Sequence, residues 1–237
     1  AAVYTPFSFI LLYEVYLVIY YLPKSITTYI GKQYEIITLI IIRRIFKDLS
    51  DLKLSSNWFE IKNDLQFTYD IIASIILFYL LYFFYRKSRK KQEVPLKMIN
   101  SNIDSFITFK KAVATCLVPV LIIIAVYSFS NWISALINPE IMIGVSFKNI
   151  NNIFFDEFFT LLILVDVILL LASFYYTDKF HKVIRNSGFI ISTILIRLSF
   201  SVSGLLNTVL IVGAIVFGLL ILIIHNKFEE ELNQNMT

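Results

Sequence analysis

The sequence is poor in charged residues, and this scarcity decides its class. Aspartate, glutamate, lysine and arginine make up 16% of its 237 residues, whereas hydrophobic residues make up 58%. A soluble domain carries about a quarter charged residues. The charges also fall in clusters between long apolar runs, and the mean hydropathy is +0.75. A soluble globular domain is therefore excluded, and the sequence predicts a polytopic membrane protein.

Cysteine and histidine are nearly absent, which removes several kinds of site. The single cysteine, Cys116, cannot form an internal disulfide and is interpreted as a small buried hydrophobic residue. His181 and His225 have no second histidine at ligand spacing, so metal or haem ligation is not expected. There is no phosphate-binding loop, nucleophile elbow or HExxH motif. We expect a protein that is not an enzyme and whose sequence requires no metal or cofactor.

Glycine and proline are also scarce, with six and five residues respectively. The broken helices of large transporters need such residues inside their spans, and only Pro119, Gly213 and Gly218 lie well inside apolar segments. This scarcity argues against an alternating-access transporter. A voltage sensor is excluded because no helix repeats arginine at every third position. Ala214 and Gly218 form a small-xxx-small pair, which predicts close helix packing.

Seven apolar segments can be distinguished between the polar clusters. They predict an all-α transmembrane bundle of about seven spans, with six to eight as the range. The second and sixth segments are shorter than the roughly 17–25 residues that cross a bilayer, so we expect them to be tilted or to cover part of it. The predicted helices cover residues 8–22, 30–46, 65–85, 112–133, 158–176, 188–200 and 205–224.

The distribution of lysine and arginine predicts an orientation. Loops 23–33, 86–111 and 177–187 are basic and fall on one side of a seven-span chain, so the N-terminus is expected outside and the C-terminus inside. A re-entrant first pair would change individual loops, because 43–65 is also basic. The membrane is expected to be a bacterial inner membrane or an organellar one. The basic side is predicted to contact lipid headgroups through Arg86, Lys87, Arg89, Lys90 and Lys91.

Segments of the first half resemble segments of the second. Residues 34–46 read YEIITLIIIRRIF and 188–200 read GFIISTILIRLSF, which places Arg43 over Arg197. Likewise LLYEVYLVIYYL and ILVDVILLLASF place Glu14 over Asp166. Four spans separate the two starts, so both units should point the same way, as a parallel repeat. The alternative is coincidence among Ile-rich segments. The expected organisation is a first repeat over 1–86, a basic linker over 87–111, an extra transmembrane helix over 112–137, a loop over 138–157, a second repeat over 158–226 and a polar tail over 227–237.

Charged residues inside apolar segments are the candidate site. A charge at mid-bilayer is costly unless it is paired, so we predict the pairs Glu14–Arg43 and Asp166–Arg197. These pairs can be structural, or they can line an ion path. Arg44 has no counterpart in the second half and is expected to reach the lipid headgroups.

Two further acids are secondary candidates. Glu35 lies three residues after Lys32 and is expected to pair with it along the helix. Asp70 lies one turn inside its segment and is expected at the membrane interface.

An acidic helix followed by an apolar helix that ends in arginine resembles the pattern of the phosphate-starvation-inducible E (PsiE) family of small bacterial membrane proteins. The resemblance rests on LLYEVYLVIYYL with YEIITLIIIRRIFKDL, and again on VDVILLL with GFIISTILIRL, about half of the chain. It implies a membrane helix bundle and supplies no reaction. The duplication and the intervening segment 112–133 depart from a simple member of that family.

Three classes of function fit these patterns. The first is a non-catalytic subunit that packs against other membrane subunits or copies of itself, with membrane lipids and no nucleic acid as further partners. The second is ion or proton permeation along Glu14, Asp166 and the arginines. The third is a lipid, quinone or pigment site among the aromatic residues, which comprise 22 Phe, 14 Tyr and 2 Trp.

Overall fold

The computed structural model describes residues 4–49, 62–89, 101–137, 147–176, 179–202 and 204–234, and their regular structure is helical throughout. The helices coincide with the seven predicted segments, so the all-α prediction is confirmed. Both α4 and α5 begin roughly three turns earlier than predicted, since their polar first turns also form helix. The bounds are α1 Tyr4–Tyr21, α2 Ile26–Leu49, α3 Lys62–Arg89, α4 Ser101–Ile137, α5 Phe147–Tyr176, α6 Phe180–Ser199 and α7 Leu205–Gln234.

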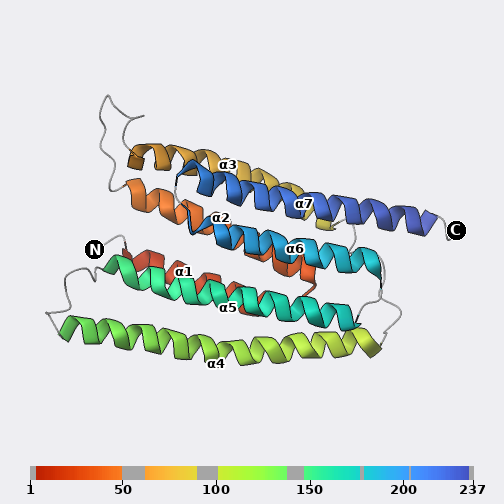
Figure 1. The fold of residues 1–237 in the computed structure, drawn as a ribbon, viewed down its shortest axis with the longest axis horizontal. Helices are drawn as coiled ribbons and strands as arrows, with labels where there is room; N and C mark the ends of the chain where they lie inside the picture. The colour runs from red at the N-terminus through yellow and green to blue at the C-terminus, as the bar shows by residue number, and fades with distance from the viewer. Residues whose placement is uncertain are drawn as a thin grey trace.

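Successive helices run in opposite directions along an elongated bundle (Figure 1). Helices α3 and α7 pack together and cover α2 and α6, which also touch each other. Helix α1 packs on α2, helix α5 packs on α6, and α4 packs alongside α5 and, less extensively, α1. The last residues of α1, α3, α5 and α7 and the first residues of α2, α4 and α6 therefore lie at the same end of the bundle (Figure 1). The described basic residues near these helix ends include Lys24, Lys32, Arg86, Lys87 and Lys179, and we call this end the basic end.

Four of the described helices are long and apolar enough to cross a membrane, which indicates an integral membrane protein. They are α3, α4, α5 and α7, with apolar stretches over Leu65–Ser88, Asp104–Tyr127, Glu157–Tyr176 and Leu205–Leu232. The central helices α2 and α6 carry more polar side chains and are not among them. Polar residues within a membrane bundle normally face its interior, which is where α2 and α6 lie.

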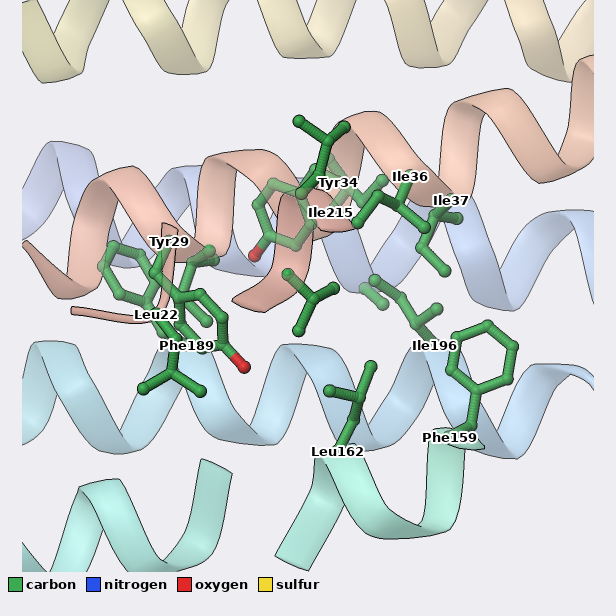
Figure 2. Packing of buried hydrophobic residues seen from close by; sticks show 14 of the residues in the cluster. Leu22, Tyr29, Tyr34, Ile36, Ile37, Phe159, Leu162, Phe189, Ile196 and Ile215 are labelled. Carbon is green, nitrogen blue, oxygen red and sulfur yellow. The ribbon is translucent and has the colours of Figure 1, made fainter. Parts of the chain in front are cut away.

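Large side chains from α2, α5, α6 and α7 fill the interior. Ile36 and Ile37 of α2 face Ile196 of α6 and Leu162 of α5, with Phe159 at the side of the group (Figure 2). The outer helices bury less. Helix α4 turns much of its surface outward, so Cys116 is exposed there, contrary to the prediction that it is buried.

The predicted close packing at Ala214 and Gly218 is present between α7 and its neighbours. Tyr34 of α2 is fully buried, and its hydroxyl lies 2.7 Å from the Ser192 hydroxyl of α6. Ser192 donates to the Ala214 carbonyl at 2.6 Å, so the Tyr34 hydroxyl donates to Ser192. A Cβ at Gly218 would lie 1.9 Å from the Tyr34 hydroxyl oxygen. Because Gly218 has no Cβ, the Tyr34 side chain can reach Ser192 on α6.

Candidate functional site: the buried charges of the bundle

The first buried charge pair joins α1 to α2. Arg43 Nη2 lies 3.5 Å from Glu14 Oε2, as the sequence led us to expect. The Glu14 side chain is 1% exposed, and neither of its oxygens accepts a hydrogen bond from a described residue. Glu14 is therefore held by the charge of Arg43 more than by hydrogen-bond geometry. Truncation of Arg43 would leave a buried carboxylate without its counter-charge.

The second pair corrects the expectation that Arg44 reaches the lipid headgroups. Arg44 turns inward from α2 and donates through Nε and Nη2 to both oxygens of Asp70 on α3. Its Nη2 also donates to Asn207 Oδ1 on α7 at 2.9 Å, and Gln66 donates to Asp70 at 2.8 Å. Asp70 is fully buried and so does not lie at the membrane interface as predicted. A bidentate pair of this kind is strong and specific in direction, and here it ties α2, α3 and α7 together.

The third buried acid, Asp166 of α5, contacts partners other than the predicted Arg197. Gln33 of α2 donates to its two oxygens at 3.0 and 3.1 Å, and Thr193 of α6 donates at 3.1 Å. Arg197 is not among the partners of Asp166 within the described part of the chain. Its guanidinium lies 5.4 Å from the centre of the Phe159 ring.

The depth of Arg197 in the bundle explains why the predicted pair is not formed. Arg197 Nη2 lies 3.5 Å from Thr160 Oγ1, and Thr160 is six residues before Asp166 on α5. Six residues span about 9 Å along a helix axis, so the arginine lies more than a turn from the carboxylate. Thr193, one turn before Arg197, occupies the level of Asp166 instead.

Asp166 and Arg197 nevertheless border the same small cavity. It has a volume of about 30 Å³ and lies between α1, α2, α5 and α6. Its polar groups come from Gln33, Asp166, Thr193 and Arg197, and the remaining lining is apolar. That volume admits water and excludes an organic substrate. The arrangement can hold a hydrated carboxylate in an otherwise apolar interior.

A fourth charged group lies at the basic end of the bundle. Lys32 Nζ lies 2.7 and 2.8 Å from the two oxygens of Glu35, the local pair that the spacing predicted. Tyr85 of α3 donates to Glu35 at 2.5 Å, and the Lys32 ammonium also lies 4.9 Å from the centre of the Tyr21 ring. This group joins the ends of α1, α2 and α3 and is half-buried.

Sequence reasoning missed a cluster at the ends of α6 and α7. The rings of His181 and His225 stack 5.3 Å apart, and Arg185 Nη1 lies 3.0 Å from His225 Nε2. Glu229 lies 4.0 Å from His181 and 3.8 Å from His225. The four-residue spacing of His225 and Glu229 on one helix could have revealed half of this cluster. The other half depends on how α6 packs against α7.

The predicted lipid-facing basic residues are only partly placed by the structure. Arg86 is exposed, and Lys87 is half-buried, with its carbonyl accepting a hydrogen bond from Asn226 Nδ2 at 3.1 Å. Arg89 ends α3, and its side chain is outside the description, as are residues Lys90 and Lys91 entirely.

Neither metal chemistry nor similarity to other proteins adds to this picture. Within the described ranges, no three His, Cys, Asp or Glu side chains gather as a metal site would require. No protein-family model matches the chain, and neither a curated protein nor a solved structure matches it. Function must therefore be argued from the residues themselves.

Proposed function

We propose that this chain is a non-catalytic multi-pass membrane protein that packs against other membrane subunits or against copies of itself. The observation that carries the proposal is a row of outward-facing tyrosines on α1. Tyr13, Tyr16 and Tyr20 are 53%, 56% and 49% exposed, and their spacing of three and four residues places them on one side of the helix. The rings of Tyr16 and Tyr20 stack 5.6 Å apart.

The depth of these tyrosines argues for a protein neighbour. Tyr20 is near the end of α1, where lipid headgroups can receive a hydroxyl, but Tyr13 is at the middle of the helix. An unpaired hydroxyl in hydrocarbon costs several kcal/mol, on the order of 4–8 on an alkane scale. A neighbouring helix that offers acceptors removes this cost, and tyrosine is enriched at protein interfaces for the same reason.

The buried acids support the same proposal because each is engaged by another helix of this bundle. Glu14 faces Arg43, Asp70 faces Arg44, and Asp166 accepts from Gln33. Such charges fix the arrangement of helices and so maintain an outer surface of constant shape. This is the behaviour expected of a packing subunit.

The test is the mass of the gently solubilised particle, measured by light scattering with the detergent contribution subtracted. The double variant Tyr13→Leu/Tyr16→Leu should release a smaller particle than the parent protein. The control is Tyr79→Leu, an equally exposed tyrosine on α3 near the basic end. A parent particle with the mass of one chain and no companion would refute the proposal, as would an unchanged mass in the double variant.

Proton or ion permeation is the second candidate, favoured by the cavity beside Asp166. A buried carboxylate next to water-sized space is the usual component of a proton relay within a membrane. The assay is proton flux and ion conductance in liposomes that contain the purified chain. Permeation requires a flux in the parent protein that Asp166→Asn or Glu14→Gln abolishes. The packing function instead requires no flux in any of the three and weaker assembly in the variants.

We also propose that the bundle consists of two PsiE-like units. Supporting this, α1 packs on α2 as α5 packs on α6, and α2 pairs with α3 as α6 pairs with α7. The like helices α3 and α7 also meet, as do α2 and α6, which is expected near a twofold axis. In this proposal all seven helices cross the membrane, with the N-terminus outside and the basic ends inside. Cysteine-labelling of both ends in intact cells would test the orientation.

A further inference from the structure

Three cationic side chains lie at the start of α6, and none of them is paired with an acid among the described residues. Lys179, Lys182 and Arg185 are spaced three residues apart, so each is a neighbour of the next on the helix surface. Residues 177–187 contain these three cations against a single acid, Asp178. Lys179 is three residues after Tyr176, the last residue of the apolar stretch of α5, so the series begins where lipid headgroups are expected.

Arg185 is the most buried member of the three, and its described partners are neutral. Its Nε and Nη2 donate to Asn186 Oδ1 at 3.2 and 3.0 Å. Its Nη1 donates to His225 Nε2, because guanidinium is a donor only, so the His225 ring accepts and does not supply a counter-charge. Buried cations in proteins are normally paired with an anion.

The electrostatics of the cluster agree with a missing anion. Burial lowers the pKa of Arg185 to about 10. Burial, with the neighbouring charges of Lys179 and Arg185, also lowers the pKa of Lys182. The nearest acid on α7, Glu229, lies beside the rings of His181 and His225 instead. Among the described residues, none of the three cations therefore forms an ion pair with a carboxylate, although Glu229 Oε2 lies 3.8 Å from the same His225 Nε2 that Arg185 contacts.

The N-terminus of α6 adds to the positive electrostatic potential around these three cations. The N-cap residue is Lys179, which makes no capping hydrogen bond through its side chain, and the first turn of α6 contains no acid. The amide groups and the dipole of a helix N-terminus favour an anion, and phosphate is the anion most often held there.

An apolar groove lies at the end of α5 that precedes this cluster in the chain. It lies between α4 and α5, has a volume of about 340 Å³, and is lined by Phe109, Ile168, Leu171, Ala172, Tyr175 and Tyr176. Tyr176 is three residues before Lys179, so at most about 11 Å of chain separates the end of the groove from Lys179, the first of the three cations. The lining is almost free of polar atoms, as a hydrocarbon chain requires.

We propose that Lys179, Lys182 and Arg185 bind the phosphate of an anionic phospholipid, with one acyl chain of that lipid in the groove between α4 and α5. The phosphate supplies an anion that Arg185 does not find among the described residues, and the groove selects a lipid over a soluble phosphate. This site is independent of the proposed packing function, which rests on α1.

The experiment is native mass spectrometry of the delipidated protein in detergent, titrated separately with phosphatidylglycerol, phosphatidylcholine and inorganic phosphate. Phosphatidylglycerol should bind at least tenfold more tightly than phosphatidylcholine. The variants Lys182→Gln and Lys182→Gln/Arg185→Gln should each weaken it by about tenfold or more. Lys182 is only half-buried, so the single variant tests the site even where the double variant unfolds.

The matched control is Lys111→Gln, which removes one exposed charge at the same end of the bundle and should leave binding unchanged. Its neighbour Lys110 contacts the Lys24 carbonyl after α1, which fixes that level. Ala172→Phe fills the groove and should weaken phosphatidylglycerol. Equal binding of both lipids, or equal losses in Lys111→Gln and Lys182→Gln, would overturn the proposal. If inorganic phosphate competes with phosphatidylglycerol at equal concentration, the site binds free phosphate, and the proposal that a lipid supplies the phosphate is wrong.

Discussion

Gly218→Ala is the smallest change that tests how α7 packs against the central helices α2 and α6. The added methyl carbon would lie 1.9 Å from the Tyr34 hydroxyl oxygen and 3.2 Å from Ser192 Oγ. Tyr34 cannot easily move aside, because it is fully buried and its ring packs edge-on against Phe84 at 5.2 Å. Either the ring shifts and leaves Ser192, or α7 moves away from α2.

The expected loss in the free energy of unfolding of Gly218→Ala is the sum of two destabilising contributions and one stabilising contribution. Overpacking of a tight interior costs about 2 kcal/mol. Separation of the two buried hydroxyls costs about 2 kcal/mol more, because the Tyr34 donor then lacks an acceptor. Alanine in place of glycine within a helix returns about 1 kcal/mol. The net loss is about 3 kcal/mol, which for a chain of this size lowers the unfolding temperature by roughly 6–12 °C.

The assay is thermal unfolding in one detergent, followed by far-UV circular dichroism. The control is Gly213→Ala on the same helix, where an added Cβ meets no atom within 4 Å, so this variant should be as stable as the parent or slightly more so. The double variant Tyr34→Phe/Gly218→Ala removes the colliding oxygen and should recover part of the loss. Equal unfolding temperatures for Gly218→Ala and Gly213→Ala would show that the tyrosine does not occupy this position.

Three further predictions use the same assay. Arg44→Gln or Asp70→Asn alone should each cost about 3–5 kcal/mol, and Arg44→Leu/Asp70→Leu should cost less than either, because breaking a buried pair is worse than replacing it; additive losses would contradict this. Gly188→Ala should destabilise the bundle by about 1–3 kcal/mol, since the new Cβ would lie 2.8 Å from a carbon of its α7 neighbour; a neutral result would mean that α6 and α7 are further apart. Asp166→Leu should lower the free energy of unfolding less than Gln33→Leu, because Gln33→Leu leaves the buried carboxylate in place and removes one of its hydrogen-bond donors. The reverse order would show that Gln33 does not donate to Asp166.

The parts of the site that the sequence predicted lie within single helices or between consecutive ones. Lys32 and Glu35 are one turn apart, so their pairing follows from helix geometry alone. Glu14 and Arg43 lie on consecutive antiparallel helices, and in the predicted helices 8–22 and 30–46 both residues are nearer to the helix ends that point away from the turn between them. The lengths of the apolar runs identified all seven helices, because such runs are the strongest signal in the sequence of a membrane protein.

The parts that the sequence did not predict depend on contacts between distant helices. Arg44 follows Arg43 directly, and the sequence contains no sign that the partner of one is on α1 while the partner of the other is on α3. In a soluble helix, hydrophobic periodicity would indicate which side is buried. In a helix surrounded by lipid, both the interior and the exterior are apolar, so periodicity is weak and Asp70 could not be assigned to the interior.

Asp166 shows a second limit, which concerns the proposed repeat. Aligning the two halves places Glu14 over Asp166 and therefore predicts a second arginine partner. In the structure Asp166 accepts from Gln33, which belongs to the first half of the chain, so this contact joins the halves to each other. An alignment of repeats predicts contacts that each half makes alone, and it cannot predict those that appear where the halves meet.

The central position of α2 and α6 follows from the cost of their polar side chains. The four strongly apolar helices can face lipid at little cost, whereas α2 and α6 carry Gln33, Arg44, Ser192 and Thr193, whose polar atoms need partners. Covering α2 and α6 with α1, α3, α5 and α7 provides those partners, as each contact of this group with another helix shows. A sequence in which two helices are more polar than the four strongly apolar ones thus indicates which helices lie inside. Replacing the polar residues of α2 with leucine should therefore let α2 pack against helices other than its present neighbours, even where all the helices remain folded.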